Sequence, residues 1–461
     1  MKSWNENSVW QEMAKLTNIS LEFNTPPLGQ EQEQFNLIVA SGNYPDFIWT
    51  DGITYPGGAD KAIADGSFLK LNDLIDQYAP NYKKLINSTE TFRKETMTDE
   101  GNIWGFGMVE NKIQGAWLGM VVRRDWLDDL GMAVPETFDE WEAMLTAFKT
   151  EKGCEYPLLL SKTGVESDES LIAGFGVGGS FYQIDGKAKY GPIEPGYKEY
   201  IEKMYQWYSL GLIDKDFSSR DGTQTENFIV TDQTGAWRDG FYMLDNYVKK
   251  AQNSKFHLTA IATPVKNKGD VAHLRQTNFN VRGLYMAISC DCKYPKEAVQ
   301  FMDYLYSDTG YLLANYGIEN EAYTMVNGEP QYTDLMTKNP DGLNTTEAQN
   351  KYALQQGPMN RIWWREMFTY GKDAQECESI WGKAQSDYVM PLITMTADEG
   401  NRYATIMGDI NTYVSENRVK FIMGVEPMSK YEDFVAQIKK MGIDEVIAIQ
   451  QAALDRYNTR K

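Results

Sequence analysis

Histidine, cysteine and long apolar runs are scarce in this chain of 461 residues. It has two histidines, too few for a histidine-rich metal centre. Its four cysteines are too sparse for a disulfide-stapled scaffold: Cys154, Cys290, Cys292 and Cys377. The spacing of Cys290 and Cys292 fits neither a zinc ribbon nor a C-x-x-C redox pair. No apolar run approaches the roughly 20 residues that cross a bilayer.

Positive charge is also in short supply. Lysine and arginine number 45 against 65 aspartates and glutamates, which gives a formal net charge of -20. A nucleic-acid partner is therefore not expected, because such proteins present a basic face to the phosphates. A permanent attachment to an anionic membrane surface is disfavoured for the same reason. The length predicts two or three lobes in an ordinary soluble globule.

Alternating strand and helix patterns run along the whole chain. A short strand is expected at 47–49 and a buried strand at 121–122. Thr137 and Glu140 form a capping box that predicts a helix start, and the Asp-Gly pair within 181–190 predicts a hairpin. The last hundred residues carry mainly helical stripes. These patterns predict an α/β fold with mixed sheets.

Sequence motifs of catalysis are weak or missing. The segment 174–179 formally satisfies G-x-G-x-x-G, but a hairpin is expected after it instead of the helix that a dinucleotide fold requires. There is neither a phosphate-binding G-x-x-x-x-G-K-[ST] motif nor a G-x-S-x-G nucleophile elbow. No catalytic residue, cofactor or metal site is assigned. Because carboxylates are abundant, a glycosidase that uses an acidic pair stays an open alternative.

Aromatic residues are abundant, with 12 Trp, 28 Tyr and 19 Phe, and several stand beside polar residues in expected loops. Three clusters lie at 47–52, 237–242 and 361–365. A flat indole offers apolar area to a sugar ring, while Asp and Arg bond its hydroxyls, so the clusters favour a ligand-binding cleft. For each tryptophan, packing between lobes is the alternative. The predicted ligand-binding residues are Trp49, Asp51, Trp237, Arg238, Asp239, Tyr242, Trp363 and Trp364.

Several segments are similar to one known family. Residues 40–48 match an "SG-x-x-PD" element followed by a strand. Residues 124–131 and 135–140 match a block "R-K-D-W-L-D-K-L-G…P-x-T-x-D-E", and 316–323 look like "YGIEG-x-x-Y" with Asn320 in place of Gly. The chain thereby resembles, over nearly its whole length, family 1 of the extracellular solute-binding proteins, the maltose-binding-protein-like carbohydrate-binding lipoproteins of ABC importers.

The resemblance implies a two-lobe fold of the periplasmic-binding-protein type II kind, with hinge strands and a helical C-terminal region. It assigns 1–122 and 283–340 to lobe one, and 123–282 and 341–461 to lobe two. The chain would cross between lobes near 121–124, 282–284 and 334–346. The clusters of tryptophans would then face each other across the cleft.

The resemblance also implies a function. The protein would be a non-enzymatic, monomeric, extracellular lipoprotein that captures an oligosaccharide by hinge closure and delivers it to an ABC importer permease. Its secretion signal and lipidated cysteine would lie upstream of this chain, and the lipid anchor would be its only membrane contact. The alternatives are a carbohydrate-active enzyme (glycosidase or lyase), or the same fold binding a non-sugar solute such as a peptide. Arg238, Arg361 and Arg365 are expected to form interlobe salt bridges rather than clamp a ligand carboxylate.

Overall fold

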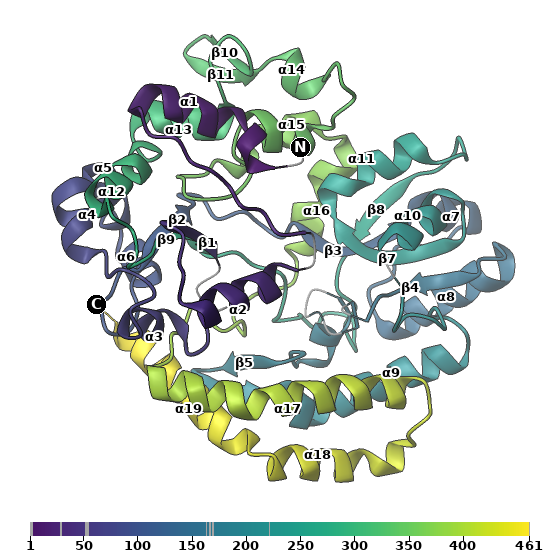
Figure 1. Cartoon of the computed structure of the whole chain (residues 1–461). Helices are drawn as coiled ribbons and strands as arrows, with labels where there is room; N and C mark the ends of the chain where they lie inside the picture. The colour runs from purple at the N-terminus through teal and green to yellow at the C-terminus, as the bar shows by residue number, and fades with distance from the viewer. Residues whose placement is uncertain are drawn as a thin grey trace.

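The computed structural model describes residues 3–27, 30–50, 55–162, 164–165, 167, 170–220 and 222–460. It confirms the expected α/β class, with strands and helices alternating along the chain. Two sheets lie in separate halves of the molecule, and helices surround both (Figure 1). No helix among the described residues combines the length and the apolar character that crossing a membrane requires.

The strands are short and distributed over the chain. They are β1 (Phe47–Thr50), β2 (Gly105–Val109), β3 (Leu118–Arg123), β4 (Tyr156–Leu159), β5 (Phe181–Ile184), β6 (Lys187–Tyr190), β7 (Thr234–Gly240), β8 (Leu258–Ile261), β9 (Val281–Ile288), β10 (Tyr323–Val326) and β11 (Glu329–Tyr332).

Helices make up most of the remaining structure. In the first half of the chain they are α1 (Ser8–Thr17), α2 (Glu31–Ser41), α3 (Gly58–Ala64), α4 (Asn72–Tyr78), α5 (Pro80–Ile86), α6 (Glu90–Thr96), α7 (Arg124–Leu130), α8 (Phe138–Glu151), α9 (Pro195–Ser209) and α10 (Gly222–Val230). In the second half they are α11 (Phe241–Lys250), α12 (Pro295–Tyr304), α13 (Asp308–Tyr316), α14 (Asp334–Thr337), α15 (Thr345–Tyr352), α16 (Lys372–Trp381), α17 (Ala397–Ile422), α18 (Tyr431–Lys440) and α19 (Ile443–Thr459).

Each of the two larger sheets defines one lobe. In lobe one β9 lies between β1 and β2, antiparallel to both, with Trp49 opposite Met286. In lobe two the strand order is β4-β7-β3-β8, with Val121 of β3 opposite Trp237 of β7. A separate hydrophobic core packs against the lobe-one sheet, and two further clusters cover the opposite faces of the lobe-two sheet. Each sheet is thus stabilised by its own buried apolar area.

Local sequence signals predicted several elements correctly. The Thr137 side chain caps α8 by accepting the backbone amide of Glu140. The Glu140 carboxylate accepts the backbone amide of Thr137, which completes the capping box. The hairpin of β5 and β6 turns at Asp185 and Gly186, both with positive φ, as a two-residue turn between twisted strands requires. The glycine-rich segment 174–179 leads into β5 and not into a helix, so it lacks the context of a dinucleotide site.

The strand pairing differs from the predicted lobe boundaries at two places. Residues 118–122, which the prediction gave to lobe one, belong to β3 and pair within the lobe-two sheet. Leu354 and Met359, which the prediction gave to lobe two, lie in the core of lobe one. The chain therefore passes between the lobes through 110–117, 262–280 and 360–371, and we call these the three crossing segments.

Where they leave lobe one, the crossing segments are hydrogen-bonded to one another. The amide of Val109 donates to the carbonyl of Met359 at 2.8 Å, and the amide of Arg361 donates back to Val109 at 2.7 Å. The amide of Glu110 donates to the carbonyl of Asn280 at 2.7 Å. Backbone pairing therefore fixes the three segments side by side.

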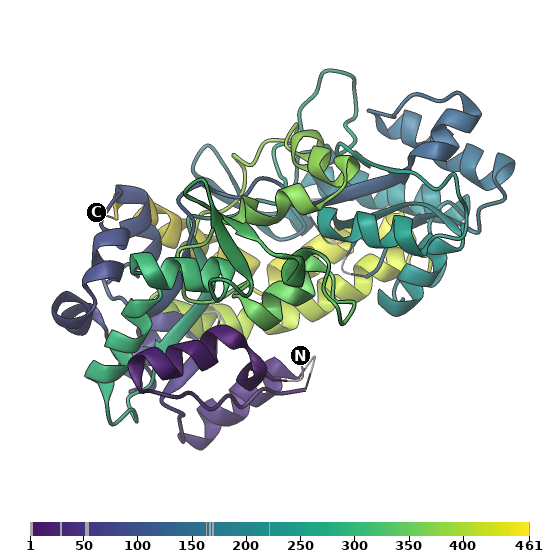
Figure 2. The ribbon, with the colours of Figure 1, turned by 90° about the horizontal axis from the view of Figure 1, so that it is seen from above.

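Helices α17, α18 and α19 form a C-terminal strap along one side of the molecule (Figures 1 and 2). Their apolar residues belong to the lobe-two core, where α17 contacts α9. The first turns of α17 instead contact α3 of lobe one, and Gly400 leaves no room for a Cβ against the backbone of Gly57. The strap therefore touches both lobes.

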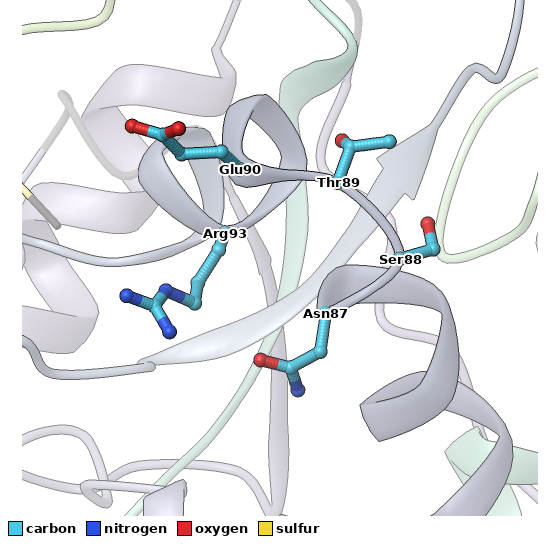
Figure 3. Close-up of a pocket in the computed structure, with 5 residues that line it drawn as sticks. All are labelled: Asn87, Ser88, Thr89, Glu90 and Arg93. Atoms are coloured by element: carbon cyan, nitrogen blue, oxygen red, sulfur yellow. The ribbon is translucent and has the colours of Figure 1, made fainter.

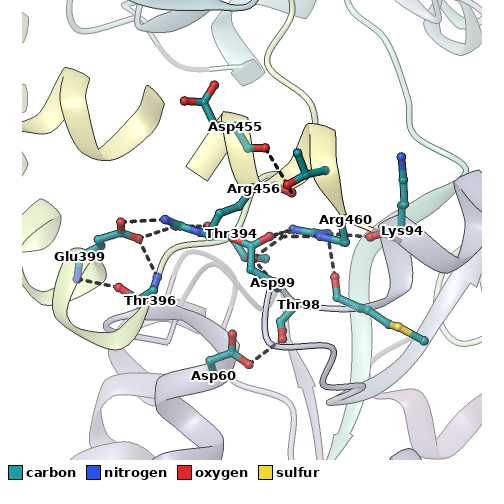
Figure 4. A network of polar contacts seen from close by, with 12 residues as sticks. Asp60, Lys94, Thr98, Asp99, Thr394, Thr396, Glu399, Asp455, Arg456 and Arg460 are labelled. Atoms are coloured by element: carbon teal, nitrogen blue, oxygen red, sulfur yellow. Dashed lines mark hydrogen bonds and ion pairs between the residues drawn. The ribbon is translucent and has the colours of Figure 1, made fainter. Parts of the chain in front are cut away.

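The end of the strap is fixed to lobe one by Asp99, whose carboxylate is almost fully buried (Figure 4). Arg456 donates to Asp99 at 2.8 Å and to Glu399 at 2.9 Å. Arg460 also donates to Asp99, and Thr394 accepts the amide of Asp99 at 3.0 Å. One buried carboxylate thus balances two guanidinium groups from the last helix and the residue beyond it.

Substituting Asp99 should destabilise the protein, because both arginines would lose their shared buried counter-charge. For Asp99→Ala we expect the free energy of unfolding to fall by about 3 kcal/mol, measured by urea denaturation. The matched control is Asp433→Ala, which removes a solvent-exposed ion pair with Lys430 and should leave the midpoint unchanged. Equal midpoints for wild type and Asp99→Ala would contradict the role of the strap anchor.

Candidate functional site

The crossing segments carry a buried ion pair at their lobe-one end. Arg361 donates to Glu110 at 2.7 Å, and their side chains are 4% and 0% exposed. Arg361 also donates to Gln114 at 3.1 Å, and Glu110 accepts the amide of Gln114 at 3.2 Å. Arg361 thus forms a salt bridge, and this bridge joins the first and third crossing segments rather than one lobe to the other. Arg365 donates to Asn315, to the carbonyl of Leu354 and to Gln355.

Amide side chains extend this network toward lobe two. Asn278 donates to Gln114 at 3.4 Å and accepts from Gln276 at 3.0 Å. The Oε1 atom of Gln276 accepts the backbone amide of Trp117 at 2.8 Å, and the Trp117 indole donates to Asn278 at 3.4 Å. The side chains of Trp117, Gln276 and Asn278 are partly exposed. They offer donors and acceptors of the kind that bind hydroxyl groups.

An aromatic pair stands where the first crossing segment enters β3. The rings of Trp117 and Tyr242 lie 6.2 Å apart. Tyr242 is in the first turn of α11, and the amide of Phe241 donates to the carbonyl of Trp117 at 3.1 Å. Tyr242 is 36% exposed. The junction of the two lobes therefore presents aromatic surface beside polar side chains, as sugar sites do.

Arg238 and Asp239 lie at the end of β7, next to this pair, and both are partly exposed. The carboxylate of Asp239 accepts bonds from the Tyr247 hydroxyl and from the Gly240 amide. Burial raises the pKa of Asp239, and the Tyr247 bond offsets this only in part. Burial likewise raises the pKa of Tyr242, and the charge of Asp239 adds to the shift.

Trp363 and Trp364 begin a 3₁₀ helix (Trp363–Thr369) in the third crossing segment. Trp363 is buried and its indole donates to the carbonyl of Lys112 at 3.0 Å, whereas Trp364 is 41% exposed. The ammonium group of Lys112 lies 5.5 Å and 5.4 Å from the two ring centroids. Lys112 thus joins the first and third crossing segments through cation–π contacts.

The other predicted binding residues occupy different surroundings. Trp237 is fully buried within lobe two, with Val121 opposite it and Tyr247 edge-on at 6.0 Å. In this conformation its indole has no surface to offer a ligand. Trp49 is partly buried in lobe one, 4.9 Å from the ring of Trp4. Asp51 lies outside the described residues.

Sequence reasoning missed Trp117, Gln276 and Asn278. Trp117 stands between small apolar residues and a strand, without the neighbouring charges that marked the three predicted clusters. Gln276 and Asn278 form the run Gln-Thr-Asn at 276–278, and this polar run in an otherwise unpatterned stretch was the available signal.

A surface pocket of about 440 Å³ lies elsewhere, at the turn between α5 and α6 (Figure 3). Its lining residues are Asn87, Ser88, Thr89, Glu90 and Arg93. They belong to lobe one, and none of them was predicted to bind ligand. Among the residues with assigned positions, no group of three acidic, histidine or cysteine side chains converges on a possible metal position.

A second buried carboxylate, that of Glu95, accepts a backbone hydrogen bond where the second crossing segment enters lobe one. Glu95 of α6 accepts the amide of Val281, the first residue of β9, at 2.8 Å. Burial raises the pKa of Glu95 to about 7, although bonds from the amides of Val281 and Asn280 favour the charged form. Glu95 therefore titrates near neutral pH at the end of the second crossing segment.

Comparison with known proteins gives the same architecture. The structure matches that of the alginate-binding protein AlgQ2 without calcium ion, with a TM-score of 0.83, 27% identity, and 97% and 94% of the two chains covered. The fructooligosaccharide ABC transporter substrate-binding protein FusA of Streptococcus pneumoniae is 24% identical over 100% of this chain and 89% of its own length. Lipoprotein LipO of Bacillus subtilis is 22% identical over 94% of this chain and 86% of its own length.

Two lobes joined by three crossing segments define the class of solute-binding proteins. The model of the family described as bacterial extracellular solute-binding protein matches residues 2–311, and the chain belongs to this family. The family resemblance and the two-lobe fold predicted from the sequence are therefore confirmed. This family consists of binding proteins, so the chain is a binding protein and not an enzyme, which answers the glycosidase alternative.

Burial of Trp237 predicts a role in stability. Trp237→Ala should lower the free energy of unfolding by about 3–5 kcal/mol, because it leaves a large cavity in lobe two. Trp364→Ala removes an exposed ring and should cost about 1 kcal/mol or less. Chemical denaturation of the two variants checks this difference. A Trp237→Ala variant as stable as wild type would contradict the structure at this position.

Glu95 predicts a pH-dependent stability. Its pKa in the folded protein is about 7, above the ordinary 4.5, so the folded state binds the proton more tightly than the unfolded chain. The stabilising contribution is complete below about pH 4.5 and is lost as the pH rises through about 7. The unfolding free energy of wild type minus that of Glu95→Gln should therefore fall by about 3 kcal/mol between pH 4.5 and 8. A pH-independent difference would contradict this assignment.

Proposed function

We propose that this protein is an extracellular substrate-binding protein that captures an oligosaccharide between its lobes and delivers it to the permease of an ABC importer. The family supports the class of function. The names of FusA and AlgQ2, which bind a fructooligosaccharide and alginate, support a carbohydrate ligand. The alternative to a carbohydrate ligand is a peptide, which the same fold could also bind.

The observation that carries the proposal is the aromatic pair at the lobe junction. Trp117 and Tyr242 stand beside the amides of Gln276 and Asn278. Aromatic rings pack on the CH faces of a sugar, and amides exchange hydrogen bonds with its hydroxyls. In this proposal the ligand contacts four of the predicted residues: Arg238, Asp239, Tyr242 and Trp364. Trp237 and Trp363 are buried and pack beneath these residues without contacting the ligand.

Closure of the lobes would provide the mechanism. A ligand that contacts both lobes binds the closed conformation better and therefore shifts the population toward it. Among the described residues before α17, the main chain passes from one lobe to the other at the crossing segments, so the rotation would occur there.

The proposal includes a location and a partner. An importer receptor works outside the cell, and the relative named lipoprotein LipO supports a lipid-anchored, cell-surface protein. We propose that the protein acts as a monomer and reaches the membrane only through that anchor and its permease.

The proposal predicts binding without turnover. A thermal-shift screen with fructo-oligosaccharides, oligoalginates, oligogalacturonates and peptides should give a raised melting temperature with a glycan, and chromatography should recover that glycan unchanged. Trp117→Ala should then weaken the glycan's affinity by about tenfold or more, equivalent to about 1.4 kcal/mol, as measured by calorimetry.

The matched control is Tyr294→Ala, because Tyr294 is 69% exposed and precedes α12 of lobe one. It should bind the glycan as wild type does. A shift with peptides alone would overturn the carbohydrate ligand, and unchanged affinity in a folded Trp117→Ala variant would overturn the site.

A further inference from the structure

Arg275 lies in the second crossing segment, directly before Gln276. Its side chain is partly exposed, and Nη1 donates to the carbonyl of Gln276 at 2.9 Å. The Nε atom is enclosed and has no hydrogen-bond acceptor. Within the described part of the chain, no carboxylate forms an ion pair with this guanidinium. Arg275 therefore holds unused donors at the lobe junction.

Several other arginines of this chain have carboxylate partners. Arg123 pairs with Asp125 at 2.6 Å, Arg220 with Asp214 at 2.6 Å, and Arg361 with Glu110 at 2.7 Å. The chain carries 65 acidic residues, so carboxylates are plentiful. The Arg275 guanidinium at the junction differs from these three arginines.

Glu378 of α16 is the carboxylate whose charge acts on Arg275, from beyond ion-pair distance. Its side chain lies against Gly115 of the first crossing segment, where a Cβ would meet Oε1 at 2.2 Å. Burial lowers the pKa of Arg275, and the charge of Glu378 offsets this only in part. The positive charge of Arg275 is thus incompletely balanced.

The surroundings of Arg275 connect it to the aromatic pair. The side chain of its neighbour Gln276 accepts a hydrogen bond from the backbone amide of Trp117. The carbonyl of Trp117 in turn accepts one from the first backbone amide of α11. A helix start carries partial positive charge. Asp239 is the acidic group nearest to that helix start along the chain, and its carboxylate is engaged by Tyr247 and Gly240.

We propose that the ligand is an acidic oligosaccharide and that Arg275 receives its oxyanion, a uronate carboxylate or a sulfate ester. This inference rests on the proposed function of glycan capture. The Nη edge of the guanidinium offers paired N–H groups to two oxygens, a geometry that a neutral hydroxyl does not match. In a protein of net charge -20, such a local cation also offsets the long-range repulsion of an anionic ligand.

The test compares glycans that differ in charge alone. Calorimetry would measure oligogalacturonates and oligoalginates as free acids and as methyl esters, carrageenan oligosaccharides with and without sulfate, and neutral fructo-oligosaccharides. Wild type should bind one acidic form at least about tenfold more tightly than its neutral counterpart. Arg275→Gln should remove that preference and leave the affinity for the neutral form within about twofold.

Two controls separate charge from folding. Arg402→Gln removes an exposed guanidinium of α17, which pairs with Glu445, and should keep the preference. The melting temperature of ligand-free Arg275→Gln should match that of wild type. Tight binding of a neutral glycan with no preference for charge, or a preference that survives Arg275→Gln, would overturn the inference while the proposed function stands. Binding of no glycan would overturn both.

Discussion

The buried contact between Glu110 and Arg361 is the interaction on which the arrangement of the two lobes depends. Removing two charges from water is unfavourable, and the bonds around them must compensate for it. Here the compensation comes from the first and third crossing segments themselves, through Gln114 and the backbone pairing at Val109. The charged pair therefore exists only when these segments lie together, so it specifies their register as well as their proximity.

The lobe junction at this pair combines side chains that are buried and hydrogen-bonded to one another with side chains that are partly exposed. Glu110, Gln114 and Arg361 are buried and bonded to one another. Toward lobe two, Trp117 and Gln276 are partly exposed and Tyr242 is exposed. A binding site needs both properties, because preorganised side chains lose less entropy when a ligand orders them.

Patterns confined to a few neighbouring residues predicted the fold well. The capping box at Thr137 and the Asp-Gly turn at 185–186 act locally, and the structure has both. The lobe boundaries depend on which strands pair, and strand pairing is a long-range property that residues 118–122 do not reveal by themselves. For this reason the boundary predicted between residues 122 and 123 falls inside β3.

The candidate site was predicted in part, for a related reason. Trp237 and Tyr242 belong to one aromatic-polar cluster, but the alternation of β7 directs Trp237 into the core while α11 leaves Tyr242 at the surface. Composition identifies such a cluster without saying which ring is accessible. Trp117 becomes visible as a site residue only through Gln276, which is 159 positions away along the chain.

The C-terminal strap also limits how the lobes can move. Its apolar faces belong to lobe two, while Asp99 holds its far end on lobe one. Pulling the lobes directly apart would break the buried contacts of Asp99, whereas a swing about an axis close to the strap would preserve them. Rotation of the lobes at the crossing segments would then be least free on the side of α17 to α19 and freest at the opposite edge of Figure 1, where the β10–β11 hairpin lies.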